Sequence, residues 1–142
     1  MRPRKYITGM TALGIWGTDW HIPAERDRFQ IAGVDFEPLD RLFGDGEVVD
    51  CRERLERLEI PIPPELEEVP CATPVRAYLE WAYSFLKEGH FPSVDPQDLM
   101  FGEDELREVM RYLYRLRDTE EDPAVKERIS LWLSHLESRE DC

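Results

Sequence analysis

Two successive stretches in the last third of the chain repeat apolar residues at helical spacing. Spacings of three and four place such residues on one face of a helix. The first stretch begins after Gly102 and carries Leu106, Val109, Met110, Leu113 and Leu116. The second follows Pro123 and carries Val125, Ile129, Trp132, Leu133 and Leu136. The polar turn at 118–123 is short, so the pattern predicts an antiparallel helical hairpin.

A longer helix is predicted upstream, from Thr73-Pro74 to Gly89. A hydroxyl at the cap followed by proline in the first turn is typical of a helix start, and glycine of a helix end. Its apolar stripe is formed by Val75, Tyr78, Leu79, Ala82, Phe85 and Leu86. The charged residues that fall largely off this stripe are Arg76, Glu80 and Lys87.

Three further segments have weaker signals. Pro38 to Gly44 favours a short helix, with proline at its first position and glycine at its end. Asp50 with Glu53 resembles a capping box, and starts a predicted helix that runs to Leu58. The proline-rich residues 60–64 are predicted to be an extended connector. Later in the chain, Ser93 or Asp95 before Pro96 is predicted to start one further helical turn.

The first third of the chain has a residue pattern that favours strands. Residues 6–16 are rich in β-branched and aromatic residues and favour one strand, or two short ones interrupted by glycine. Residues 28–34 alternate Phe29 and Ile31 with Gln30 and favour a second strand. The expected class is therefore α+β, with a small N-terminal antiparallel sheet packed on a mainly helical C-terminal two-thirds. An all-α fold is the alternative, because a two-stranded sheet alone is marginally stable.

The length of 142 residues predicts one domain, with a strand- and loop-rich part at 1–47 and a helical part at 48–142. The three cysteines Cys51, Cys71 and Cys142 are widely spaced, and no apolar run approaches the ~18 residues of a membrane span. The N-terminus makes a poor signal peptide. We therefore expect reduced thiols and a cytoplasmic location.

Charge changes the picture more than composition does. The chain has 31 acidic and 18 basic residues, a net charge of −13, and residues 37–70 alone hold eleven acids against four bases. Nucleic acids and anionic membranes are disfavoured, because binding phosphates requires clustered Lys and Arg. A basic protein partner is favoured, since complementary charge speeds encounter. Solubility alone is the simpler explanation for such a charge.

Motifs for established chemistry are missing from the sequence. The three histidines His21, His90 and His135 lie far apart, without a second metal ligand at helical spacing. There is no glycine-rich phosphate loop and no GxSxG elbow. We expect no cofactor and no structural metal, and an enzymatic role is less expected than a binding role.

One polar constellation could form a site. In an extended loop, Asp19 and His21 point the same way, and a carboxylate beside an imidazole can make a general base. Trp16 and Trp20 could supply a stacking surface for a ligand. A purely structural loop explains the same residues: Asp19 making a local turn and Trp20 anchoring the loop in the core.

A second candidate surface is acidic and aromatic. Glu65, Glu67 and Glu68 are expected to contribute to a negative face. The rings of Tyr78, Trp81, Tyr83, Tyr112 and Tyr114 exceed what one helix face can bury, so some are expected to emerge, and Trp81 and Tyr83 are taken as binding anchors. A solvated face is the simpler alternative.

Four short motifs lie in the N-terminal third: Ile7-Thr8-Gly9, Ala12-Leu13, Asp19-Trp20-His21 and Phe43-Gly44-Asp45. With these motifs the N-terminal third resembles a family of small bacterial proteins to which no chemistry is assigned. In that family a glycine precedes the Asp-Trp-His triplet, whereas Thr18 does so here. The resemblance covers about 40 residues and implies a bacterial chain in which the triplet acts as a unit.

The leading hypothesis is an acidic cytoplasmic protein-binding protein, an antitoxin- or immunity-like inhibitor of a basic partner. The alternative is a small enzyme or ligand-binding domain with its site at Asp19 and His21. A third possibility is a homo-oligomer assembled through the C-terminal helices.

Overall fold

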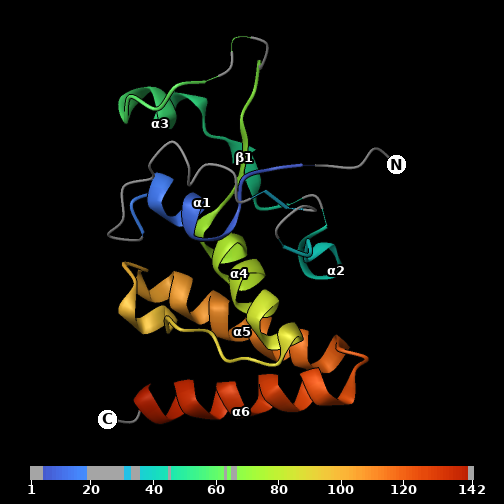
Figure 1. Ribbon diagram of the computed structural model, residues 1–142. Helices are drawn as coiled ribbons and strands as arrows, with labels where there is room; N and C mark the ends of the chain where they lie inside the picture. The colour runs from blue at the N-terminus through green and yellow to red at the C-terminus, as the bar shows by residue number, and fades with distance from the viewer. Residues whose placement is uncertain are drawn as a thin grey trace.

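The computed structural model describes residues 5–18, 31–32, 36–44, 46–62, 64 and 67–140. The elements in chain order are α1 (Gly9–Ile15), α2 (Asp40–Phe43), β1 (Val48–Asp50), α3 (Arg52–Arg57), β2 (Pro70–Ala72), α4 (Pro74–Glu88), η2 (Pro96–Asp98), α5 (Glu103–Thr119) and α6 (Pro123–Glu140). Figure 1 shows α4 crossing the middle of the molecule, with α1 on one side of it and α5 and α6 on the other.

The central helix α4 is buried on nearly every side. Every residue from Val75 to Tyr83 is buried, as is Leu86, because α1, β2, α5 and α6 all contact this helix. A helix without an exposed stripe needs a partner for each polar residue that it carries inward. Gly89 ends α4 in the left-handed conformation, with φ of 95°.

The predicted hairpin is present. Helix α5 buries Val109, Leu113 and Leu116. A short turn between Thr119 and Pro123 joins it to α6, which runs back beside it (Figure 1). Three carboxylates in the first turn of α5 lie near the positive end of the helix dipole. Within the described ranges, no helix has both the length and the apolar character needed to cross a bilayer.

The α+β class is confirmed, but the strands come from other residues than expected. β1 pairs antiparallel with β2, with Val49 opposite Cys71. Of the predicted strands, only isolated bridges are described. One is antiparallel, between Ile7 and Ile31, and two are parallel, between Ile7 and Cys71 and between Ala32 and Phe36.

The prediction of a strand over residues 6–16 is wrong, because Gly9–Ile15 form helix α1. All of these residues except Met10 are buried, so no polar face marks the helical period in the sequence. Tertiary packing on α4 overrides the β preference of Thr11 and Ile15. The second predicted strand, residues 28–34, is described only at residues 31–32.

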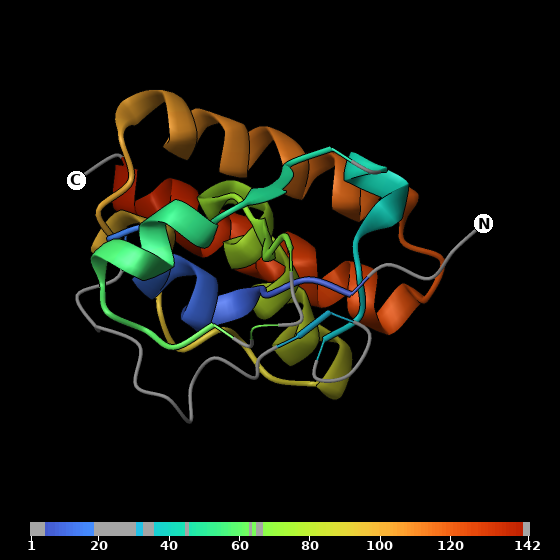
Figure 2. The ribbon, with the colours of Figure 1, turned by 90° about the horizontal axis from the view of Figure 1, so that it is seen from above.

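The short helices flank this core. Figures 1 and 2 place α2 and α3 on opposite sides of α4. Gly44 follows α2 at φ of 57°, as the glycine terminator predicted. The helix predicted from Asp50 starts two residues later, since Val48–Asp50 pair as a strand and Asp50 instead accepts the N–H groups of Arg52 and Val69.

Candidate functional site

A half-open groove of about 310 Å³ lies between α6 and the segment that joins α4 to α5. Its lining residues are Phe91, Pro92, Asp95, Leu131, Trp132 and His135. Phe91 and Leu131 are 50% and 55% exposed, whereas Trp132 is buried. Large apolar side chains exposed side by side are typical of binding surfaces.

One rim of the groove is polar and tightly paired. Asp95 Oδ2 lies 2.7 Å from His135 Nε2 and accepts a 2.8 Å hydrogen bond from Arg139. Arg139 also donates two hydrogen bonds to Asp98, at 2.9 and 3.0 Å. The hydrogen bonds from Arg139 lower the pKa of Asp98. These contacts fix the 95–98 segment on the end of α6, so this rim is held in place before anything binds.

The His135–Asp95 pair is better suited to binding than to catalysis. A carboxylate can orient an imidazole for general-base work, but Arg139 shares the same oxygen of Asp95 and draws its charge away from the ring. No serine, threonine or cysteine lines the groove as described. The groove therefore offers apolar contact area with a polar edge.

Behind the groove, two buried polar atoms have no hydrogen-bond partner among the described residues. They are Trp132 Nε1 and Gln97 Oε1. The amide nitrogen of Gln97 donates to the carbonyl oxygen of Leu136, at 3.2 Å. Gln97 therefore packs against α6, the helix that carries Trp132. An unpaired buried donor costs about 1–3 kcal/mol, and native interiors hold few of them.

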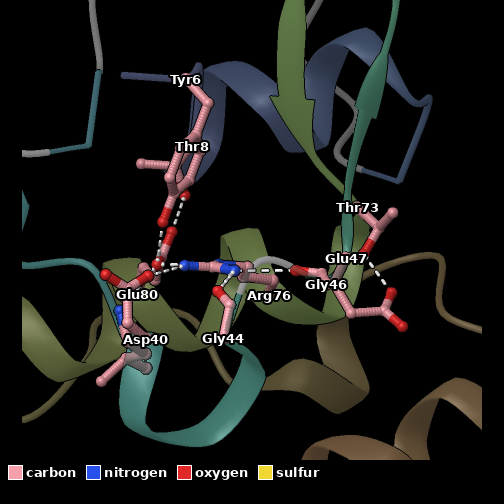
Figure 3. A network of polar contacts seen from close by, with 10 residues as sticks. Tyr6, Thr8, Asp40, Gly44, Gly46, Glu47, Thr73, Arg76 and Glu80 are labelled. Atoms are coloured by element: carbon pink, nitrogen blue, oxygen red, sulfur yellow. Dashed lines mark hydrogen bonds and ion pairs between the residues drawn. The ribbon is translucent and has the colours of Figure 1, made fainter. Parts of the chain in front are cut away.

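A second polar cluster is fully buried around Glu80 (Figure 3). The Glu80 carboxylate accepts hydrogen bonds from the hydroxyls of Tyr6 and Thr8 and, at 2.9 Å, from the backbone N–H of Leu39. The carboxylate also accepts a hydrogen bond from Arg76 Nε, at 3.1 Å. Burial first, and then the negative charge of Glu80, raise the pKa of Tyr6, so its hydroxyl stays a donor.

Arg76 extends this cluster to the segment around α2. Its Nη1 donates to the carbonyl oxygens of Gly44 and Gly46 at 2.9 and 2.7 Å, and its Nη2 to Asp40 at 2.7 Å (Figure 3). Burial is the largest single influence on the pKa of Arg76 and lowers it, but Glu80, Tyr6 and Asp40 together outweigh burial, and the pKa of Arg76 is raised. Both side chains are 0% exposed, so no ligand reaches them. Arg76 and Glu80 fall off the predicted apolar stripe and are nevertheless buried, because α4 is enclosed on several sides.

A third cluster joins α2, α4 and the end of α5. Glu120 accepts hydrogen bonds from Tyr83 at 2.6 Å and from Arg41 at 2.9 Å. Lys87 pairs with Glu37 one turn further along α4. Together with the Arg76 contacts, these pairs fasten residues 37–44 and Gly46 along α4, which is a structural role.

Several predicted site residues lie outside the described ranges. They are Asp19, Trp20, His21 and Glu65, so the proposed Asp19–His21 site stays a prediction. Trp16 is described and half-buried. Its indole N–H donates to the Ala72 carbonyl oxygen at 2.8 Å, which ties the end of α1 to β2.

The expectation that surplus rings emerge at the surface is wrong for α4. Trp81 and Tyr83 are 6% and 1% exposed, and Tyr78 is fully buried. The reason is again that α4 has more than one covered face. Tyr112 and Tyr114 on α5 are half-buried. Trp81 and Tyr83 are core residues in this structure, and the exposed rings and aliphatic chains lie elsewhere.

The negative surface is described in part. We call residues 46–62, 64 and 67–69 the acidic arm, which comprises β1, α3 and the segment that returns toward β2. The arm has three arginines and seven acidic residues, and all seven acids are exposed. The acids are Glu47, Asp50, Glu53, Glu56, Glu59, Glu67 and Glu68. Arg54 donates to the carbonyl oxygen of Ile15, which fastens α3 to α1.

Sequence reasoning missed the groove and the cluster at Glu80. Nothing near His135 in the sequence marks a partner for it, because Asp95 is 40 residues away in the chain. The Arg76–Glu80 spacing of four residues was the available signal for a buried pair. Among the described residues, no three histidine, cysteine or acidic side chains are grouped so as to hold a metal ion.

No family model matches this chain, and the comparisons with curated proteins and with solved structures likewise gave no match.

Proposed function

We propose that this chain is an acidic protein-binding protein of the bacterial cytoplasm, which inhibits a partner by covering a basic surface in the manner of an antitoxin or immunity protein. The observation that carries the proposal is the acidic arm. Its seven carboxylates are exposed, and Glu59, Glu67 and Glu68 have no cation paired with them among the described residues.

The position of the arm suits such a role. Figure 1 shows α3 and β1 at the end of the molecule away from α6, where a partner can approach without meeting the helical hairpin. A surface of one sign accelerates encounter with a surface of the opposite sign and disfavours wrong partners. The arm is also anchored, through the Arg54–Ile15 contact and the β1–β2 pairing, so it presents its charges on an ordered backbone.

The test begins with capture of a stoichiometric partner from a bacterial lysate at about 50 mM salt. That partner is then purified and its binding measured by calorimetry at about 50 and about 500 mM salt. We expect the dissociation constant to rise at least about ten-fold, because salt screens exposed charges. The partner's own activity should fall when the chain is added in equimolar amount.

Two triple variants with the same net charge separate the arm from charge in general. Glu59→Gln/Glu67→Gln/Glu68→Gln removes carboxylates from the arm, and Glu103→Gln/Asp104→Asn/Glu121→Gln removes the same number near the two ends of α5. We expect weaker binding only for the arm variant. Equal binding by both, or binding that ignores salt, contradicts the proposal.

A further inference from the structure

We propose that the groove between Phe91 and Leu131 is an anchor pocket for a protein partner. The pocket would take one apolar side chain of the partner, and basic residues of the partner would flank that side chain. The positive charge of the partner is taken from the proposed function, on which this part of the proposal rests. The pocket lies on a different part of the molecule from the acidic arm, and the expectation of an apolar side chain comes from the groove itself.

The size and lining of the groove suit a single anchor. About 310 Å³ lies at the lower end of the range for ligand sites, roughly 300–1,000 Å³. Phe91, Pro92, Leu131 and Trp132 supply most of the lining. Hot spots of protein interfaces are typically such pockets, where one large side chain is desolvated against aromatic and aliphatic walls.

The surroundings of the groove favour positive flanks on the occupant. On α6, Glu127, Leu131 and His135 are four residues apart, so a carboxylate, an aliphatic chain and an imidazole follow one another along one face. Glu88 ends α4 three residues before Phe91. Both glutamates are exposed and neither has an ion-pair partner among the described residues.

Two of the cations near the groove, Arg139 and Arg128, are already engaged. Arg139 is held by Asp95 and Asp98, and Arg128 Nε donates to the carbonyl oxygen of Leu86 at the end of α4. An acidic occupant would therefore meet the free carboxylates of Glu88 and Glu127, whereas a basic one would pair with them.

The experiment uses three ten-residue peptides and the full chain labelled with ¹⁵N. The first peptide has one central phenylalanine flanked by lysines, the second has the lysines replaced by glutamates, and the third has the phenylalanine replaced by alanine. The indole N–H resonance of Trp132, assigned with Trp132→Phe, reports on the groove. We expect the first peptide to shift it, and the other two to bind at least about ten-fold more weakly.

Matched variants test the location. Leu131→Asp and Met100→Asp each replace an exposed apolar side chain by one carboxylate, in the groove and between η2 and α5 respectively. Because the added charge is the same, general attraction of the lysine peptide changes equally. We expect Leu131→Asp to weaken binding about ten-fold or more and Met100→Asp to leave it unweakened.

The remaining outcomes each overturn one claim. Shifts confined to the acidic arm, with Trp132 unmoved, contradict the pocket and leave the proposed function standing. Equal binding of the lysine and glutamate peptides contradicts the charge of the partner. A Trp132 resonance that moves with protein concentration alone indicates that a second copy of this chain occupies the groove, and contradicts the proposal.

Discussion

Glu80 shows how a charge is retained inside this protein. A buried carboxylate without partners is costly, and here every side of the group is engaged by a hydroxyl, a backbone N–H or the guanidinium of Arg76. The aromatic rings of Tyr6 and Phe43 lie within 4.8 and 5.4 Å of the Arg76 guanidinium carbon, which adds cation–π attraction. The cluster therefore specifies how three separate segments meet.

Glu80→Gln keeps the shape of the side chain but removes its charge. The amide nitrogen accepts no hydrogen bond, so Tyr6 or Thr8 loses an acceptor, while the buried Arg76 loses its buried counter-ion and keeps only Asp40, whose side chain is exposed. We expect a loss of about 3–5 kcal/mol in the free energy of unfolding, measured by urea denaturation. Glu88→Gln, exposed at the end of the same helix, is the control. A loss below about 1 kcal/mol for Glu80→Gln would show that the pair is dispensable.

At the scale of elements, the helices that carry charged residues beside an apolar stripe were predictable, and α1 was not. The spacing of apolar residues predicted α4, α5 and α6 to within a few residues, although α4 is buried on nearly every side. It failed at α1, because these seven residues include no charged side chain to mark a polar face. β1 and β2 have three residues each, too few for alternation to show. The groove joins residues about 40 apart, a juxtaposition that only the folded chain creates.

The hairpin depends on its buried stripe and not on the groove above it. Leu113 is fully buried between α5 and its neighbours, whereas Leu131 is largely exposed on α6. We expect Leu113→Ala to cost about 2–5 kcal/mol through lost burial and the cavity left behind. Leu131→Ala should cost less than about 1 kcal/mol. Thermal unfolding of both variants checks the difference, and equal losses would mean that the groove wall is part of the core.

Asp50 links β1 to the start of α3 through a charge at the surface. The backbone N–H groups of Val69 and Arg52 donate to it and lower its pKa from an ordinary value of 3.8. Its contribution to stability is therefore complete above that value and is lost as the pH falls through the lowered pKa. We expect Asp50→Asn to melt below the wild type at pH 7, with the gap closing on acidification. A gap that is independent of pH would exclude the charge as its cause.

For the whole molecule, the two candidate binding features lie at different ends of one body. The acidic arm carries exposed carboxylates on and beside α3, and the groove gathers exposed apolar side chains beside α6. Figure 1 shows α3 and α6 at opposite ends of the molecule. The sequence predicted the arm from the local excess of acids, but placed the aromatic anchors on α4, where Trp81 and Tyr83 are core residues. A partner that used both features would have to extend over the length of the molecule.

The long reach of the Glu80 cluster also sets the earliest point in synthesis at which α1 can pack on α4. Tyr6 and Thr8 bind a residue that is 74 and 72 positions further along the chain. With only seven residues, α1 is too short to be stable alone. At about 5–20 residues per second, the segment that forms α1 therefore waits on the order of 4–15 seconds for α4 to be synthesised. During that interval its apolar residues are open to chaperones.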